Sequence, residues 1–397
     1  MIAQINPKTR QARYFDIRRL TPREVYRLMG VSDDDIDLLL TTRLRGAWQK
    51  DDPQLTLFSE EEWNDMLTDE IHVPIIPASD HYMLAGNSIV VDVLTAILRQ
   101  MFRPGITNGD DTAWNYRHPS GRPVNVVTVC SGFDAQCLAM QRLVDELTDD
   151  ISEPPLTYRL VAWAEFDPES QRPLNRQPAV VAHNLLFPDA EKLNLGDMTK
   201  IDWEQIVPKR VKRGDVDLLT YSTPCVDISK AGKQAGIAKD SGTRSAVLWY
   251  TEQAIQALKP RFLLQENVSA LVGQKAMPHF RQWLDTVSAL GYRNYWAVLN
   301  SKKYGVPQNR ERLFCVSVRE DICPGAVFAW PTPQALTRVI ADIIEKQADR
   351  RFFLPAENVI AFLRKRGGQE MIYVETDRKF TEAEIIYTIE HEQQQEA

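Results

Sequence analysis

The chain has 397 residues, of which 44% are hydrophobic and 25% are charged, and its formal net charge at pH 7 is −7. This length is sufficient for one large core or for two unequal domains. The content of 18 Gly and 23 Pro excludes a collagen-like or wholly disordered chain. We expect no membrane-spanning helix and no secretory signal, because there is no apolar run of about 18 residues and no basic segment before an apolar one at the start.

Cysteine and histidine are sparse and scattered. The five cysteines stand at 130, 137, 225, 315 and 323 without CxxC spacing, and the six histidines show no HxxxH or HxH spacing. An odd, sparse set of cysteines is typical of the reducing cytoplasm. We therefore expect a cytoplasmic protein with no metal site.

The net negative charge excludes binding to duplex DNA through overall charge alone. The charges are segregated, however. Acidic residues gather at 33–35, 60–62 and 390–396, whereas basic residues gather at 209–213, 302–303, 310–312 and 364–366. The pattern is compatible with a local basic groove, although solvated surface is the usual role of any single cluster.

Short apolar runs alternate with helical patterns through the middle of the chain. A helix at Val90–Met101 and a linker at 103–124 come first. Strands are then predicted at Val126–Val129, Leu160–Trp163, Asp217–Tyr221, Phe262–Leu264, Tyr295–Leu299 and Leu313–Val318, with helices near Ala135–Glu146 and Ala246–Leu258 and a helical region at 331–366. This alternation predicts an α/β fold with a doubly wound, mostly parallel sheet. Ligands of such folds bind at the carboxyl ends of the strands.

The first two strands end in residues suited to a nucleoside-type ligand. Gly132, in the turn 130–134, allows a ligand to approach the backbone near a helix N-terminus. Glu165 follows the second strand, where an acidic residue commonly hydrogen-bonds ribose, and Phe166 beside it can stack on a purine. A solvated Glu and a core Phe are the alternative.

The later strands end in residues suited to covalent chemistry. Cys225 follows Thr223-Pro224 and is a candidate nucleophile, although most cysteines are inert buried thiols. Glu266, if desolvated, can act as an acid. Arg310 and Arg312 alternate before the last strand and so point to one side, where they suit carbonyl oxygens or phosphates.

Together these residues resemble the DNA (cytosine-5) methyltransferases, which use S-adenosylmethionine. The Pro-Cys motif is similar to Pro224-Cys225, the Glu-Asn-Val motif to 266–268, and the Gln-x-Arg-x-Arg motif to 308–312. The spacing is 41 residues from Cys225 to Glu266 and 42 from Glu266 to Gln308. Segments 19–30 and 86–91 resemble the ninth and tenth motifs, which come last in ordinary members. The resemblance therefore implies a circularly permuted member with a Rossmann-like methyltransferase fold.

The resemblance assigns roles residue by residue. Cys225 is expected to be the nucleophile and Glu266 to protonate cytosine at N3, while Arg312 holds the base at O2 and Arg310 supports the loop and the substrate. The residues expected to line the S-adenosylmethionine site are Gly132, Phe133, Glu165, Phe166, Asp197, Met198, Pro224, Val247, Asn87 and Ser88. Those expected to contact the DNA are Ser229, Arg244 and Gln308.

The chain departs from the family pattern in the cofactor turn and in its recognition region. Cys130 replaces a Phe, Asp134-Ala135 replace two glycines, and Val226 replaces a Gln. The domain order implied is 1–102 as a permuted segment with an insert at 31–81, a linker at 103–124, a catalytic core at 125–320, and a helical extension with a reduced target-recognition region at 321–397.

The implied function is methylation of carbon 5 of a flipped-out cytosine in double-stranded DNA through a covalent Cys225 adduct, as in bacterial or phage DNA modification. The reduced recognition region leaves room for a separate recognition subunit, and a restriction-modification system would add a cognate endonuclease. Two alternatives stay open. One is an RNA (tRNA) cytosine-5 methyltransferase, and the other is a non-catalytic, methyltransferase-like DNA-binding subunit.

Overall fold

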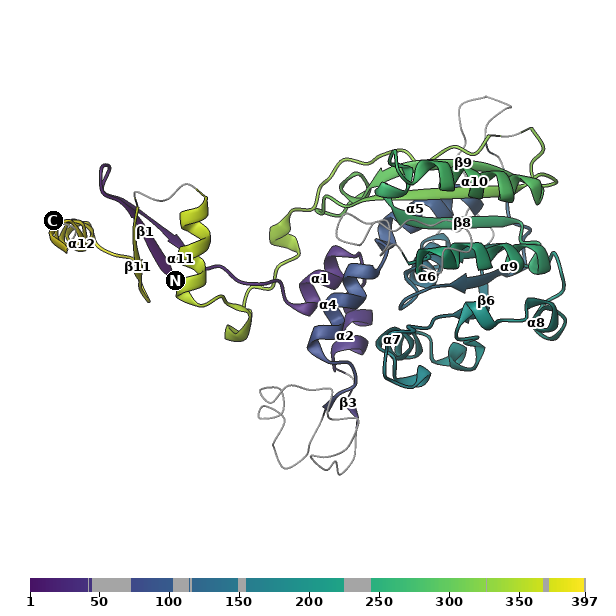
Figure 1. Cartoon of the computed structure of the whole chain (residues 1–397), viewed down its shortest axis with the longest axis horizontal. Helices are drawn as coiled ribbons and strands as arrows, with labels where there is room; N and C mark the ends of the chain where they lie inside the picture. The colour runs from purple at the N-terminus through teal and green to yellow at the C-terminus, as the bar shows by residue number, and fades with distance from the viewer. Residues whose placement is uncertain are drawn as a thin grey trace. The chain divides into compact units, whose positions relative to one another are not determined.

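A computed structural model of the chain describes residues 1–41, 43–44, 73–102, 114, 116–148, 155–224, 244–325, 327–366 and 371–395 (Figure 1). The chain divides into two compact units. Residues 25–343 form the first, which we call the sheet unit. The two chain ends, 1–24 and 344–397, form the second, which we call the terminal unit.

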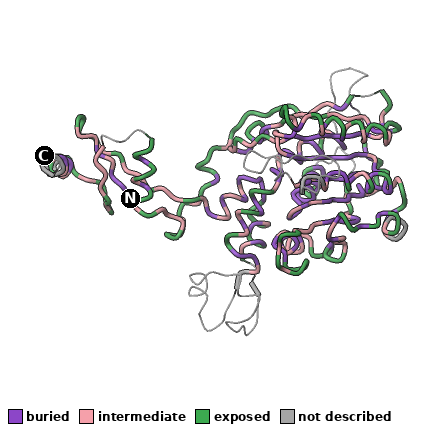
Figure 2. Tube along the Cα trace, in the orientation of Figure 1, coloured by how far each residue is buried: buried purple, intermediate pink, exposed green. Residues whose placement is uncertain are grey.

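A six-stranded sheet is the framework of the sheet unit. Its strands in spatial order are β6 (Tyr158–Ala164), β5 (Val124–Val129), β7 (Leu218–Tyr221), β8 (Phe262–Val268), β10 (Glu311–Arg319) and β9 (Tyr292–Asn300). The first four are parallel, and β10 runs antiparallel to both of its neighbours. The inner strands are buried along almost their whole length (Figure 2), as expected for parallel strands covered on both faces. The predicted mostly parallel, doubly wound sheet is confirmed.

Helices cover both faces of this sheet. One apolar core lies beneath α1 (Pro22–Leu28), α2 (Asp33–Thr41), α4 (Ala78–Asn87), α5 (Val91–Phe102), α6 (Ala135–Thr148) and α7 (Pro178–Leu186). The other lies beneath α8 (Trp203–Arg210), α9 (Thr251–Leu258) and α10 (Met277–Ala289). Residues from before the sheet in the sequence therefore complete one of its two layers. A short two-stranded pair, β3 (Arg43–Leu44) with β4 (Val73–Pro74), lies between α2 and α4 in the sequence.

The stretch Ala78–Phe102 is long and apolar enough to cross a membrane by length and composition. Eight of the twelve residues of α5 are buried, and they contribute to the same core as α6. Burial within the protein is the ordinary explanation for a helix that is apolar on most sides.

The predicted strands are all present at the expected places. Five are two to four residues longer than predicted, and β7 begins one residue later than predicted. The helix predicted near Ala246–Leu258 begins as a 3-10 helix at Arg244–Tyr250 and becomes α-helical only in α9. The helical prediction for 331–366 is largely wrong. It contains two 3-10 turns, Ile340–Asp342 and Arg350–Phe352, and one α-helix, α11 (Ala356–Lys365). Pro331, Pro333 and Pro355 explain this, since proline lacks the N–H that an interior helical turn needs.

In the described part of the predicted linker 103–124, the aromatic side chains are packed, whereas Arg117 and residues 119–121 are exposed. Trp114 is 1% exposed, and its indole N–H donates to the carbonyl of Met101. The Tyr116 ring packs edge-on against Phe262 of β8, with 4.9 Å between ring centroids. The Pro and Gly content suggested an exposed connection, which residues 119–121 are, but Trp114 and Tyr116 anchor the segment to the core.

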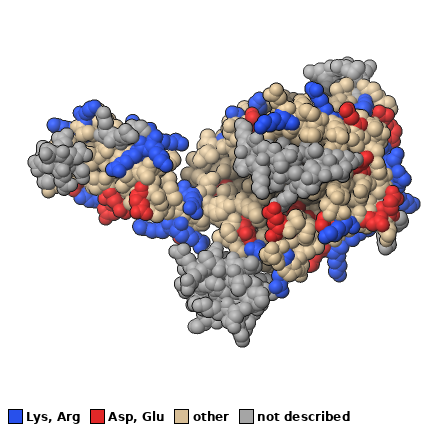
Figure 3. Space-filling view, in the orientation of Figure 1, with Lys and Arg blue, Asp and Glu red and all other residues tan. Residues whose placement is uncertain are grey.

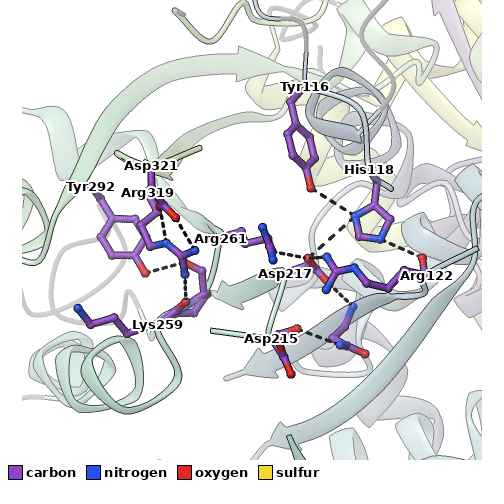
Figure 4. Close-up of polar contacts among 12 residues, drawn as sticks. Tyr116, His118, Arg122, Asp215, Asp217, Lys259, Arg261, Tyr292, Arg319 and Asp321 are labelled. Carbon is purple, nitrogen blue, oxygen red and sulfur yellow. Dashed lines mark hydrogen bonds and ion pairs between the residues drawn. The ribbon is translucent and has the colours of Figure 1, made fainter. Parts of the chain in front are cut away.

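A buried carboxylate ties this segment to the sheet (Figure 4). Asp217 is fully buried at the start of β7 and accepts hydrogen bonds from the Arg122 guanidinium and, at 2.9 Å, from the N–H of Asn125. The Nε atom of Arg261 lies 3.1 Å from the same carboxylate, and Nδ1 of His118 lies 4.0 Å away. Asp217 thus joins the segment before β5 to the amino ends of β7 and β8.

The terminal unit is a three-stranded antiparallel sheet between two helices. Its strand order is β11 (Ile372–Glu375), β1 (Ile2–Asn6), β2 (Gln11–Phe15). One face packs against α11 through Ile2, Val359 and Leu363. The other packs against α12 (Glu382–Gln395) through Ala3, Ile5, Ile385 and Ile389.

Asp217→Asn should lower the free energy of unfolding by about 3 kcal/mol, because it removes the charge that the buried ends of Arg122 and Arg261 face. The control is Asp215→Asn, two residues away, where only the backbone carbonyl accepts a hydrogen bond from Asn125. Urea unfolding measures both. Equal stability of the two variants would contradict the role given to Asp217.

Candidate active site

The carboxyl ends of β5, β6, β7 and β8 gather most of the predicted residues. The turn between β5 and α6 has an unusual backbone, because Cys130, Gly132 and Asp134 all have positive φ, at 51°, 58° and 67°. A Cβ built on Gly132 would meet nothing within 4 Å, so the space beside this residue is open. The turn therefore exposes its backbone at the point where the sequence predicted a ligand.

Asp134 fixes this turn. Its carboxylate is fully buried, accepts a hydrogen bond from the Thr128 hydroxyl at 2.6 Å, and caps α6 by accepting from the N–H of Cys137 at 3.1 Å. Nε2 of His183 lies 3.5 Å from it, and the His183 ring stacks on Trp163. The sequence analysis noted Asp134 only as a departure and missed His183. An Asp directly before a predicted helix is an N-cap signal that could have revealed this role.

The predicted cofactor residues at β5 and β6 lie together. The Gly132 N–H donates to Oε2 of Glu165 at 2.8 Å. Phe133 is 1% exposed, and its ring packs edge-on against Tyr26, so its side chain belongs to the core. The ring of Phe166 is half-buried and lies 5.7 Å from Nζ of Lys200.

The predicted residues 197–198 lie beside the same turn. Sδ of Met198 is 3.3 Å from Sγ of Cys130. Asp197 accepts hydrogen bonds from the N–H and the hydroxyl of Thr199 and pairs with Lys200. Partial burial acts to raise the pKa of Asp197, but these hydrogen bonds and the Lys200 charge together lower it below its ordinary value. Asp197 is therefore a local cap of a 3-10 turn as well as a site candidate.

These residues fit a nucleoside-type cofactor. The space beside Gly132 is open, the Glu165 carboxylate borders it, and Oγ of Ser131 is buried without a hydrogen-bond partner in the described structure. A carboxylate of this kind suits ribose hydroxyls, and the N-terminus of α6 suits an anionic group. In the described parts of the chain, no group of three or more His, Cys, Asp and Glu side chains could hold a metal ion.

The end of β7 approaches the end of β8. The side-chain amide of Asn267 donates to the carbonyl of Thr223 at 3.2 Å, and this bond holds the backbone before Pro224, which is half-buried. The sequence analysis quoted Asn267 without giving it this role. Cys225 and Ser229 lie outside the described residues. Arg244 begins a 3-10 helix, and its side chain is not described, whereas Val247 on that helix packs partly against the core.

Glu266 and Arg312 form an ion pair where the end of β8 meets the start of β10. Glu266 is 8% exposed, and its Oε1 lies 3.2 Å from Nε of Arg312. Burial raises the pKa of Glu266 to about 7, although the charges of Arg312 and Arg310 act to lower it. A carboxyl group with this pKa can hold or release a proton at neutral pH.

Arg310 joins the loop before β10 to the end of α4. Its Nη2 donates to the carbonyl of Gly86 at 2.8 Å and to that of Ser88 at 2.7 Å. Asn87 between them is exposed. Gln308 has a buried Oε1 without a hydrogen-bond partner in the described structure, and its carbonyl accepts from the Ser301 hydroxyl. Arg310 thus binds backbone, so the structure gives it a positioning role.

A pocket of about 390 Å³ lies elsewhere in the sheet unit, lined by residues of α1, α2, α5, α6 and the segment 338–342. Its charged lining residues are Arg27, Asp33, Asp92, Arg142, Arg338 and Asp342. It shares no residue with the predicted sites.

The chain is similar in sequence to known DNA methyltransferases. The model of the family "C-5 cytosine-specific DNA methylase" matches residues 177–395, more than half of the chain. The chain is 42% identical over 172 residues to the type II methyltransferase M2.ScrFI of Lactococcus lactis subsp. cremoris, covering 43% of this chain and 45% of that protein. It is 43% identical over 107 residues to the orphan methyltransferase M.SssI of Spiroplasma monobiae, covering 26% and 28%. The matches thus span about half the length of these curated relatives or less.

Solved structures similar to the chain include a mutant of Spodoptera frugiperda DNMT2, with a TM-score of 0.41 and 17% identity over 60% of this chain and 65% of that one. Another is a DNA modification methyltransferase, described as putative, from an Escherichia coli prophage, with a TM-score of 0.36 and 20% identity over 50% and 47%.

Replacing Asp134 tests whether the turn needs its carboxylate or only its backbone conformation. Asp134→Gly suits the positive φ but loses both hydrogen bonds, so we expect it to weaken binding of S-adenosylmethionine by about tenfold, the scale of one lost helix cap. Asp134→Asn keeps an acceptor for the Cys137 N–H and should lose less. Calorimetric titration measures both, and wild-type affinity in the Gly variant would show that the carboxylate is unnecessary.

Glu266→Gln should stabilise the protein at pH 8 and leave its stability at pH 4 nearly unchanged. The pKa of Glu266 is about 7 when folded against 4.5 ordinarily, so between these values the folded state holds a proton that the unfolded state lacks. Wild-type stability therefore falls as the pH rises through this window. The gain at pH 8 reaches up to about 3 kcal/mol, since one pKa unit is worth about 1.4 kcal/mol. Urea unfolding at both pH values measures it, and a variant no more stable at pH 8 would refute the raised pKa.

Proposed function

Because the chain belongs to the family of C-5 cytosine-specific DNA methylases, we propose that it transfers a methyl group from S-adenosylmethionine to carbon 5 of cytosine in double-stranded DNA. The observation that carries the proposal is the buried Glu266–Arg312 pair beside the backbone that leads through Pro224 into Cys225. The target carbon is hidden in the duplex stack, so the base must be flipped out of the helix first.

Cys225 is the proposed nucleophile. Its thiolate adds to carbon 6 of cytosine and forms a carbon–sulfur bond, which makes carbon 5 electron-rich. Glu266 supplies a proton at N3 and so neutralises the charge that develops on the ring. Once carbon 5 has received its methyl group, water takes the proton from carbon 5 and the carbon–sulfur bond breaks as the Cys225 thiolate leaves. Glu266 takes back the proton from N3.

The two arginines have separate proposed tasks. Arg312 holds O2 of the cytosine, and its ion pair with Glu266 fixes both groups toward one base. Arg310 acts through the backbone, because it ties the loop before β10 to the end of α4 and thereby positions Arg312 two residues later.

S-adenosylmethionine supplies a methyl group on a positively charged sulfur. We propose that Glu165 binds its ribose hydroxyls, that the open turn at Gly132 and the N-terminus of α6 accept its carboxylate end, and that Met198 and Phe166 form an apolar wall. Asn87, Ser88, Phe133, Asp197, Pro224 and Val247 stay predicted members of this site, and Ser229, Arg244 and Gln308 stay predicted DNA contacts.

We infer further that the chain is circularly permuted. The contacts of Arg310 with Gly86 and Ser88 support this, because they place the segment that resembles the tenth motif against the segment that resembles the Gln-x-Arg-x-Arg motif, over 220 residues apart in sequence. The segment 116–124 then connects the permuted part to β5. The two chain ends, joined in the terminal unit, are the proposed target-recognition region.

The biological setting that we propose is DNA modification in the cytoplasm of a bacterium or during phage growth. The relatives at hand include both type II and orphan methyltransferases, so a cognate endonuclease or a separate recognition subunit is a candidate partner. These proposals rest on the kind of relative and not on a contact within this chain.

Cys225→Ser should abolish methyl transfer and leave cofactor binding intact, because serine lacks a nucleophile of comparable strength at neutral pH. The measurement is tritium transfer from labelled S-adenosylmethionine to unmethylated genomic DNA, with calorimetry for cofactor binding. The matched control is Cys323→Ser, a half-buried cysteine outside the predicted site.

Three outcomes would contradict the proposal. Full activity of Cys225→Ser would remove the covalent mechanism. Transfer to tRNA in preference to DNA in a mixed assay would make the protein an RNA methyltransferase. No transfer and no cofactor binding by the wild type would leave the non-catalytic, DNA-binding subunit as the function.

A further inference from the structure

We propose that one face of the terminal unit docks on the phosphate backbone of duplex DNA. This basic face consists of the outer side of α11 and the middle of β2 on the same side of the sheet, with Arg13, Phe362, Arg364, Lys365 and Arg366 as its principal residues. The inference rests on the proposed function and adds to it the surface that holds the DNA.

The secondary structure brings these residues to one face from two distant parts of the chain. Val359 and Leu363 turn inward, whereas Phe362, Arg364 and Lys365 on the other sides of α11 are exposed, with Phe362 42% exposed. In the sheet, Gln4 of β1 lies between Arg13 of β2 and Tyr373 of β11 in register. Since Ile2 packs on α11 and alternate residues of a strand share a face, this row lies on the α11 side.

Aromatic rings hold the cations of this face in place. The Arg366 guanidinium lies 4.8 Å from the ring of Phe362, and that of Arg364 lies 5.6 Å from the ring of Tyr373. Arginine that stacks on an aromatic ring keeps its N–H groups at the edge of the plane, where they can bind phosphate. On the side shown in Figure 3, Lys and Arg gather over the C-terminal end of α11.

Several other cations of the terminal unit are paired with carboxylates. Arg18 pairs with Glu24, Arg351 with Asp349, and Arg378 with Glu384. Within the described part of the terminal unit, Arg13, Arg364, Lys365 and Arg366 form no ion pair. Cations near the C-terminal end of a helix also interact favourably with the helix dipole. Arg13 lies on a strand, so this interaction does not account for the whole set.

The opposite face has the reverse charge. Helix α12 contains four Glu and no Lys or Arg, and it covers the other side of the sheet. The terminal unit as a whole has 14 Lys and Arg against 13 Asp and Glu, whereas the rest of the chain has 33 against 41. A polyanion such as DNA is therefore attracted to the α11 side and repelled from the α12 side.

The test is DNA binding by the full-length protein at several salt concentrations. We expect the triple variant Arg364→Ala, Lys365→Ala, Arg366→Ala to bind a duplex about 100-fold more weakly at low salt. The slope of log K against log salt should fall in magnitude by roughly 2.7, about 0.9 for each lost phosphate contact. Phe362→Ala should weaken binding with no change in the slope.

Two control variants remove the same number of positive charges as the α11 variants with which they are compared. Lys192→Ala, Lys212→Ala, Lys259→Ala removes three exposed lysines of the sheet unit, and Lys379→Ala is the partner of Lys365→Ala within the terminal unit. Both should bind DNA with nearly the wild-type slope. Circular dichroism melting checks that the variants fold, and the single variants replace the triple one if it does not.

The outcomes separate this inference from the proposed function. Methylation by the wild type together with unchanged binding and slope in the folded α11 variants would overturn the inference alone. Absence of methylation with a reduced slope would overturn the proposed function and keep the surface. Competition by tRNA stronger than by duplex DNA, lost in the same variants, would make this an RNA surface and overturn the inference.

Discussion

The desolvation of one carboxyl group is the constraint on which the site depends. Glu266 stands near the end of β8, where the strand is buried on both faces, so its charged form lacks the water that would stabilise it. The positive charge of Arg312 on the neighbouring antiparallel strand stabilises the ionised carboxylate in part. Burial and this charge together give Glu266 a pKa of about 7. A more exposed Glu would stay ionised and a fully isolated one would stay neutral, so the pairing of β8 with β10 sets the proton chemistry.

The core of the sheet unit is built from segments that lie far apart in the sequence. The core under α5 and α6 needs apolar surface on α5, but it does not need α5 to follow the sheet in sequence. Two sets of polar contacts join these distant segments. Arg310 binds the carbonyls of Gly86 and Ser88 near the site, and Asp217 binds Arg122 at the opposite end of the strands. In each set, a charged group is largely removed from water. Such a group is stable only when its partners are well placed to hydrogen-bond with it. Noncovalent contacts thus hold together segments that the sequence separates by about 90 to 220 residues.

The parts that the sequence could predict are those with a strong local signal. Buried parallel strands are continuous apolar runs, and this is why β5, β7 and β8 were found within a few residues. The site residues came from motifs at strand ends, where topology guarantees proximity. The role of Asp217 could not be found in this way, because it depends on Arg122 and Arg261 from distant segments. The contact of Asp134 with His183 could not be found either, although its capping role has a local signal. The helical pattern at 331–366 failed for the opposite reason, since its local apolar spacing was overruled by prolines and by tertiary packing.

An acidic protein that binds DNA must separate its charges in space. Most of the excess negative charge belongs to the sheet unit, where arginines such as Arg122, Arg261 and Arg312 are already paired with carboxylates and so contribute little field outside. The terminal unit is too small to bury many charges, with only two small apolar clusters on its sheet. Its surface cations therefore stay in water and act at a distance limited by the Debye length, about 8 Å at physiological salt. A DNA phosphate must come close before it experiences them, so the basic face that we propose would attract a duplex only at short range. The net charge of −7 and a function on DNA are then consistent, because orientation depends on the local field and not on the sum.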